Sequence, residues 1–225
     1  MSTPPAGDEP LEARRERAAE IASRLAEAYP DLEISLDWET PLELLVATIL
    51  SAQTTDERVN QVTGVLFDRC RTPEDYAAID RDELEEIVRS TGFFRNKAKH
   101  LQGMARKLVE EHDGEVPRTM EELVELPGVA RKTANVVLSN AFDVHAGVVV
   151  DTHVKRVSRR LGLAGSKSAA AIEKELMEVL PEEQWRPFAW RLIRHGREIC
   201  HGRTDPECGR CFLADLCPAA GTFGD

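Results

Sequence analysis

The chain has 225 residues, 42% of them hydrophobic, so it can bury a sizeable core in one or two domains. No apolar run approaches the roughly 20 residues of a membrane helix, and residues 1–10 lack the features of a secretory signal. We therefore expect a cytoplasmic protein that does not bind membranes. The net charge of −11 argues against nucleic acid as a partner, but residues 126–225 carry 14 bases and 12 acids, which permits one DNA-facing surface.

The sequence predicts an all-α fold, because Ala, Glu, Leu and Arg dominate and alternating apolar and polar residues are scarce. Caps at Thr40-Pro41-Leu42-Glu43 and Thr72-Pro73-Glu74-Asp75 mark two helix starts. Residues 148–150 fit a short strand or a buried extended link equally well. In chain order, the expected helices cover residues 11–29, 41–51, 55–69, a segment from 73, 81–90, 97–112, 119–125, 130–141, 152–161, 168–179 and 183–199.

A Pro-Gly turn at Leu126–Val129 separates two of the expected helices. Backbone N–H groups at a helix start after such a turn can bind an anion. If the anion is a DNA phosphate, it is held without reading the base sequence. Arg131 and Lys132 stand in the first helical turn, where cations oppose the helix dipole. This placement indicates a functional role, although a single lysine is more often a solvated surface residue.

A second motif is Val150-Asp151-Thr152-His153. Asp151 follows an apolar run and precedes a helix, so one interpretation is a helix N-cap. The other is a carboxylate at the floor of a cleft, near a positive charge that develops during a reaction. His145, His153 and His195 are expected to pack or form hydrogen bonds rather than bind a metal.

Four of the five cysteines lie within 18 residues, spaced C-x7-C-x2-C-x5-C from Cys200 to Cys217. Without a secretory signal, a metal site is a better interpretation than disulfides. Zinc sites usually contain two paired ligand motifs, and this segment has only one C-x2-C pair. A single [4Fe–4S] cluster needs four thiolates and tolerates unequal loops, so the spacing favours that cluster. The fifth, Cys70, is expected to be a small buried residue.

The sequence from about residue 11 to 218 resembles the endonuclease III family of base-excision DNA glycosylases, in the helix-hairpin-helix superfamily. The resemblance is specific because several separate motifs occur in the same order as in that family. The segments that carry the resemblance are residues 50–56 (LSAQTTD), 91–98 (TGFFRNKA), 126–138, 150–153 and 195–197 (HGR), with the four clustered cysteines.

The resemblance implies two helical domains flanking a DNA-binding cleft. Residues 35–145 would form a six-helix domain with the helix-hairpin-helix motif, and residues 1–34 plus 146–225 a domain with one [4Fe–4S] cluster. Lys132 matches the family's catalytic lysine and Asp151 its catalytic aspartate. The cluster ligands would be Cys200, Cys208, Cys211 and Cys217. The residues expected to bind DNA are Gln53, Phe93, Leu126, Pro127, Gly128, Val129, Ala130, Arg131 and His153.

The implied substrate is double-stranded DNA with damaged pyrimidines or abasic sites, and the protein would act as a monomer on a prokaryotic nucleoid. The damaged nucleotide is flipped out of the duplex, and Gln53 and Phe93 would fill the gap. The neutral amine of Lys132 would attack the sugar C1′ and displace the base, and the resulting Schiff base permits β-elimination. Asp151 would stabilise the cationic sugar or help to move protons.

Two alternative functions fit the sequence less well. A monofunctional mismatch or adenine glycosylase of the same superfamily is disfavoured by Lys132, and a non-catalytic DNA-binding iron–sulfur protein by Lys132 and Asp151 together. Gln53 could instead satisfy a helix end, and Phe93 could lie in the core. The chain departs from the family pattern in having Ala130 for a second Gly, a first cysteine gap of seven residues rather than six, and the bulky Phe93 for an aliphatic residue.

Overall fold

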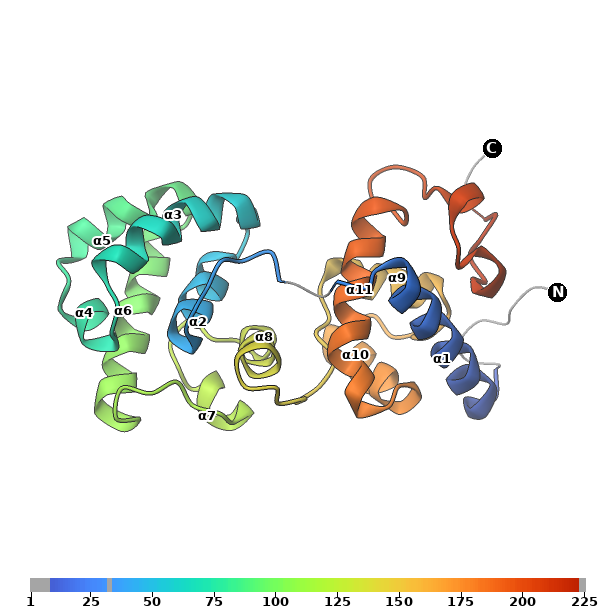
Figure 1. The fold of residues 1–225 in the computed structure, drawn as a ribbon, viewed down its shortest axis with the longest axis horizontal. Coiled ribbons are helices and arrows are strands. Elements are labelled where there is room, and N and C mark those ends of the chain that lie inside the picture. Colours follow the sequence, from blue (N-terminus) through green and yellow to red (C-terminus); the bar gives the residue numbers. More distant parts are fainter. Residues whose placement is uncertain (1–8, 32–33, 223–225) are drawn as a thin grey trace. The chain divides into compact units, whose positions relative to one another are not determined.

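The computed structural model describes residues 9–31 and 34–222, and these ranges contain no strand, which confirms the predicted all-α fold. Within them, no helix has both the length and the apolar composition to cross a membrane. The α-helices, labelled in Figure 1, are α1 (Leu11–Ala28), α2 (Pro41–Leu50), α3 (Asp56–Arg69), α4 (Pro73–Ala78), α5 (Arg81–Val88), α6 (Phe94–Glu111), α7 (Met120–Val124), α8 (Arg131–Ala141), α9 (Thr152–Arg160), α10 (Ala169–Val179) and α11 (Trp185–Glu198).

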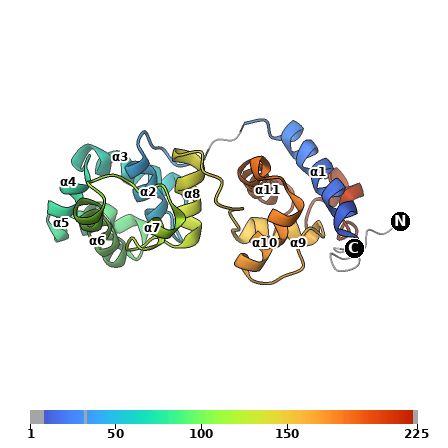
Figure 2. The ribbon, with the colours of Figure 1, turned by 90° about the horizontal axis from the view of Figure 1, so that it is seen from below.

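The chain divides into two helical units. Residues 34–146 form one, which we call the hairpin unit because it contains the Pro-Gly turn between α7 and α8. The described parts of residues 1–33 and 147–225 form the other, the cysteine unit. Helix α1 packs on α10 and α11, so the N-terminal helix belongs with the C-terminal ones (Figure 2).

Helix α2 forms the centre of the hairpin unit, with all but its first and third residues buried. Its start is a capping box, as predicted: Thr40 accepts a hydrogen bond from the Glu43 N–H, and the Glu43 carboxylate accepts one from the Thr40 N–H. Helix α8 packs against α2, and α4 packs along α6. The first turn of α8, which contains Lys132, therefore belongs to a helix that packs against the buried helix α2.

The cysteine unit is built on contacts of α11 with α9 and α1. Leu25 of α1 and Phe188 and Leu192 of α11 are fully buried in its core. The cysteine segment follows α11 and contains two short 3₁₀ helices, η3 (Cys208–Arg210) and η4 (Ala214–Leu216). The position of Asp151 and that of the cysteines are therefore set by neighbouring helices.

Two local features refine the sequence predictions. Residues 148–150 are a link without strand pairing, and Val148 and Val149 are buried in it. Helix α6 begins at Phe94, three residues before the predicted start at Lys97. The cause is the left-handed backbone of Phe93, with φ of 48°, which lets its carbonyl accept hydrogen bonds from the N–H groups of Asn96 and Lys97.

Candidate functional site

The Pro-Gly turn brings α7 and α8 together through one backbone hydrogen bond, from the Val129 N–H to the Leu126 carbonyl at 3.0 Å. Pro127 and Gly128 take the positions that a type II turn favours for these residues, and Gly128 has the required positive φ of 83°. Leu126 and Val129 are buried, which fixes the turn to the unit, while Gly128 remains exposed.

Gly128 also has no room for a side chain. A Cβ atom built there would lie 2.7 Å from the Cβ of His100 on α6, closer than carbon atoms approach. The turn is therefore pressed onto α6, and only glycine meets both the conformational and the spatial demand. Ala130, which replaces a glycine of the family pattern, has a φ of −91° that any residue adopts, so its methyl group is tolerated.

The first turn of α8 presents Arg131 and Lys132 on the surface. The residue before the helix, Ala130, offers no side-chain cap to the backbone N–H groups there. Arg131 reaches back to the carbonyl of Ala146 at 3.5 Å. This turn thus combines a helix N-terminus with two exposed cations, an arrangement suited to a phosphate group.

Asp151 is the N-cap of α9 and lies in the cysteine unit. Its Oδ1 atom accepts a hydrogen bond of 2.7 Å from the Val154 N–H. The side chain is half-buried, and the second oxygen accepts no hydrogen bond from the described residues. The capping interpretation is therefore correct, and it leaves one carboxylate oxygen available for a second role.

Gln53 and Phe93, the two expected gap-filling residues, are both exposed. Phe93 exposes 65% of its surface, so the alternative that it lies in the core is wrong. Both residues have a positive φ, 57° for Gln53 and 48° for Phe93, which is uncommon for residues with a side chain. Strained backbone of this kind often occurs at functional positions.

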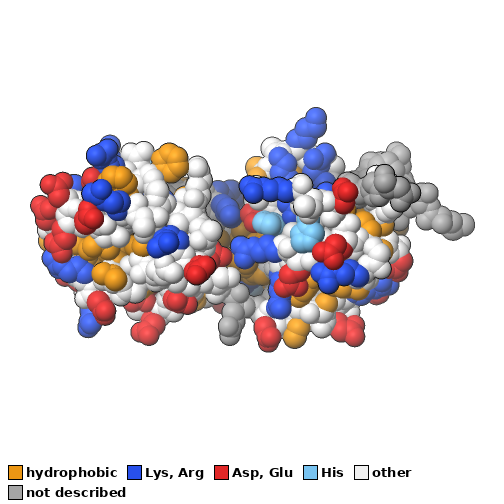
Figure 3. All heavy atoms as spheres, turned by 90° about the horizontal axis from the view of Figure 1, so that it is seen from above, with side chains coloured by type: hydrophobic (Ala, Val, Ile, Leu, Met, Phe, Trp, Pro, Cys, Tyr) orange, Lys and Arg blue, Asp and Glu red, His pale blue; other side chains and the backbone are white. Residues whose placement is uncertain are grey.

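His153 is the second residue of α9 and packs on α11 at Gly196, where an added Cβ would come within 3.1 Å of the histidine ring. Burial lowers the pKa of His153, which favours the neutral ring. Arg156 donates to the Gly196 carbonyl at 2.8 Å and to the Cys200 carbonyl at 3.1 Å. Figure 3 shows Lys and Arg side chains around histidines on one face of the cysteine unit.

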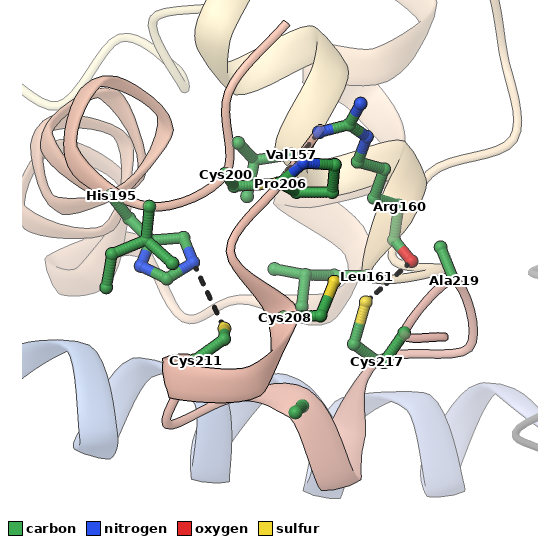
Figure 4. A pocket seen from close by; sticks show the side chains of 13 residues that line it. Val157, Arg160, Leu161, His195, Cys200, Pro206, Cys208, Cys211, Cys217 and Ala219 are labelled. Carbon is green, nitrogen blue, oxygen red and sulfur yellow. Dashed lines mark hydrogen bonds between the residues drawn. The ribbon is translucent and has the colours of Figure 1, made fainter. Parts of the chain in front are cut away.

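The four clustered cysteines line one pocket of the cysteine unit (Figure 4). Arg160 of α9 donates to the Cys200 sulfur at 3.2 Å, and the Cys217 thiol donates to the Arg160 carbonyl at 3.2 Å. The Cys211 sulfur lies 3.6 Å from Nε2 of the buried His195. In the described ranges, no three His, Cys, Asp or Glu side chains are arranged to hold a single metal ion.

Burial raises the pKa of the Cys211 and Cys217 thiols, and neighbouring cysteines add to this effect. Four thiolates so close together would repel one another, so the deprotonated set needs a compensating positive charge. Burial also lowers the pKa of His195 to about 4. As predicted, this histidine packs and forms hydrogen bonds, since its ring also faces the Tyr29 hydroxyl at 3.4 Å.

The sequence prediction missed three residues that form hydrogen bonds to the segments carrying these sites. Arg156 and Arg160 of α9 bind the start of the cysteine segment. Their spacing of four residues, which puts them on one face of a helix, was the available signal. The third is Lys97, which lies in an otherwise apolar row of α6. It is buried, with only 4% of its surface exposed.

Comparison with known proteins places these features in a family context. Residues 46–182 match the family model of the HhH-GPD superfamily base excision DNA repair proteins. An Endonuclease III of Synechocystis sp. is 56% identical over 210 residues, which covers 93% of this chain and 95% of that protein. A solved non-covalent endonuclease III–DNA complex and a trapped endonuclease III–DNA covalent intermediate each match with a TM-score of 0.87 and 44% identity, over 92% of this chain and 97% of theirs.

Proposed function

The chain belongs to the endonuclease III family of the HhH-GPD superfamily of base excision DNA repair proteins, and on this premise we propose how it acts. It is a DNA glycosylase with abasic-site lyase activity. Its proposed substrates are oxidised or ring-damaged pyrimidines and abasic sites in duplex DNA. The observation that carries this proposal is Lys132, an exposed amine in the first turn of α8, directly after the Pro-Gly turn.

The proposed reaction begins when the neutral Nζ of Lys132 attacks C1′ of the flipped nucleotide. A carbon–nitrogen bond to the enzyme forms, the bond from C1′ to the base breaks, and the base leaves and takes up a proton. Loss of the amine proton and opening of the sugar ring give a Schiff base. This group acidifies C2′–H, and loss of that proton expels the 3′ phosphate and cuts the strand. Water then releases the lysine.

Other residues of the chain would bind and orient the DNA. Asp151 would place the carboxylate oxygen that does not cap α9 against the positive charge that develops on the sugar. The Pro-Gly turn, Ala130 and Arg131 would hold a phosphate without reading sequence, and His153 would contact the DNA backbone. Gln53 and Phe93 would enter the gap left by the flipped nucleotide. We expect a monomer to suffice, acting in the cytoplasm on chromosomal DNA.

We propose that the clustered cysteines hold one [4Fe–4S] cluster. The donor set fits, because thiolates are the ligands of such clusters, and all four cysteines line the same pocket. Each of the four cysteines would supply one thiolate ligand to the cluster. The segment from Cys200 to Cys217 would thus be held at its four cysteines. We also propose that the hairpin and cysteine units are the two domains expected from sequence, 35–145 and 1–34 plus 146–225.

Borohydride trapping tests the proposed function, because borohydride reduces the Schiff base to a stable protein–DNA adduct. We expect adducts with duplexes that contain an abasic site or thymine glycol, and none with mispaired adenine. The Lys132→Gln variant is expected to lose the adduct completely. The matched control is Lys167→Gln, which removes an exposed lysine before α10 and is expected to trap like the wild type.

The alternative functions give different results. A monofunctional glycosylase would excise a base without any adduct, and a non-catalytic DNA-binding protein would bind the abasic duplex without excision or adduct. Either result with the wild type would overturn the proposal, as would an undiminished adduct with Lys132→Gln.

A further inference from the structure

Lys97 lies on the inward face of α6, in line with the buried Leu101, Met104 and Leu108. Its ammonium group uses all three of its donors. Nζ donates to the Leu50 carbonyl at 2.8 Å, to the Thr54 hydroxyl at 2.8 Å and to the Thr91 carbonyl at 2.7 Å. A buried lysine with three well-formed hydrogen bonds is a fixed structural element, unlike the mobile lysines of a surface.

The partners of Lys97 explain how a cation is tolerated there. Among the described residues it forms no ion pair, and burial lowers its pKa to about 8. Leu50 is the last residue of α2, and Thr91 the last residue of the 3₁₀ helix η1 (Arg89–Thr91). Carbonyl groups at helix ends carry partial negative charge, so two helix ends stabilise the ammonium group.

These contacts join two loops that are distant in sequence. The Thr54 hydroxyl accepts from Lys97 and donates to the Thr91 carbonyl at 2.5 Å, which closes a ring of contacts between the loops. One loop follows α2 and carries Gln53, the residue before Thr54. The other precedes α6 and carries Phe93, two residues after Thr91.

Both loops hold their exposed residue in a strained backbone conformation. Gln53 has a φ of 57° and Phe93 a φ of 48°, and Gly92 beside it has a φ of 69°. Such conformations persist only where surrounding contacts fix them. The hydrogen bonds around Lys97 lie next to both residues, since Thr54 follows Gln53 and Thr91 lies two residues before Phe93.

We propose that Lys97 is a positioning residue: by binding Leu50, Thr54 and Thr91, it holds Gln53 and Phe93 at the spacing needed to enter DNA together. This inference rests on the proposed function, in which those two side chains fill the gap left by a flipped nucleotide. Lys97 itself touches no DNA and acts only through the two loops.

A double-mutant cycle tests this role. Lys97→Met keeps the length of the side chain and removes its hydrogen bonds. We expect single-turnover base excision to fall about tenfold or more, since small misplacements of positioning groups have large effects. In a Gln53→Ala/Phe93→Ala background the same change is expected to cost less than about twofold, because the positioned side chains are already absent. Fluorescence of 2-aminopurine opposite the lesion reports insertion directly and is expected to lose its enhancement in Lys97→Met.

Thr54 supplies a second test that does not place an altered side chain in the core. Thr54→Val keeps the shape of the side chain but removes the hydroxyl that joins Lys97 to the Thr91 carbonyl. We expect Thr54→Val to reduce the 2-aminopurine signal and excision in the same direction as Lys97→Met. Thr54→Ser retains the hydroxyl and is expected to restore both.

The outcomes separate this inference from the proposed function. If Lys97→Met and Thr54→Val lower excision equally in both backgrounds, or lower only the melting temperature, Lys97 is a purely structural residue and the inference is wrong. If wild-type protein gives no borohydride adduct, the proposed function itself fails. If the adduct forms but Gln53→Ala/Phe93→Ala excises normally, the insertion role fails and the positioning role with it.

Discussion

At the scale of single residues, Asp151 has an observed role as a helix cap and a proposed role in the reaction, and one substitution separates the two. Its Oδ1 caps α9 through the Val154 N–H, and its proposed role uses negative charge. Asparagine is a good N-cap but is neutral. We expect Asp151→Asn to unfold at nearly the wild-type temperature while single-turnover excision falls by about 10²-fold or more.

Asp151→Ala is the comparison for that experiment, because it removes the cap as well as the charge. It is expected to lower stability by about 1 kcal/mol and to excise no better than Asp151→Asn. Thermal unfolding and single-turnover kinetics on the same preparations distinguish the effects. Normal excision by Asp151→Asn would show that the residue is only a helix cap.

Gly128 gives the second prediction at this scale. An alanine there would need a left-handed backbone, at roughly 1–2 kcal/mol, and its Cβ would overlap His100 on α6. We expect Gly128→Ala to lower the free energy of unfolding and to weaken DNA binding by a similar factor on every duplex, because the turn is proposed to hold phosphate rather than bases. Binding titrations on several unrelated sequences measure this.

Gly64→Ala is a matched control for Gly128→Ala. Gly64 is an exposed residue of α3, and a Cβ built there meets nothing within 4 Å. Alanine is expected to raise the free energy of unfolding by roughly 0.5–1 kcal/mol and to leave binding unchanged. A loss of binding by Gly128→Ala on some sequences only would contradict phosphate recognition at the turn.

At the scale of elements, helices with strong local signals were predictable from the sequence. The capping boxes at Thr40 and Thr72 have the predicted hydrogen bonds, because they depend only on residues three apart. The start of α6 was predicted three residues late, because the residue types around Phe93 do not mark the left-handed backbone that starts the helix. A residue with a side chain seldom adopts this conformation, so the local pattern did not predict it.

The same distinction applies to the candidate site. The turn, Lys132 and Asp151 could be identified because each belongs to a short motif at a helix start. Lys97 was not identified, because its partners lie 6 to 47 residues away in sequence. A charged residue in the apolar row of an amphipathic helix was the only sign, and it does not say what the charge binds.

At the scale of the whole molecule, the cysteine unit depends on contacts between α9, α11 and the segment that follows. Arg156 and Arg160 tie α9 to Cys200, and Arg24 of α1 donates to the Phe212 carbonyl at 3.0 Å. These contacts lie within the cysteine unit, and the hairpin unit has its own buried core around α2. Damage to the cysteine segment should therefore spread through one unit and spare the other.

Replacing one proposed cluster ligand in the full chain tests this division. We expect Cys208→Ser to reduce bound iron from about four atoms per chain and to bleach the absorption near ~400 nm. Hydrogen exchange is expected to accelerate in α1, α9 and α11, because these helices lose ordered contacts with the cysteine segment. Helices α2 to α8 are expected to retain their protection.

The control is Cys70→Ala, which changes the buried cysteine of the hairpin unit. It is expected to keep its iron and to accelerate exchange only within the hairpin unit, since a small cavity in that core weakens the helices around it. Equal acceleration in both units by Cys208→Ser would mean that the two cores unfold as one, and one zinc in place of iron would overturn the cluster. If iron is lost and protection falls only in α1, α9 and α11, the cysteine segment stabilises the unit that contains Asp151 and not the other unit.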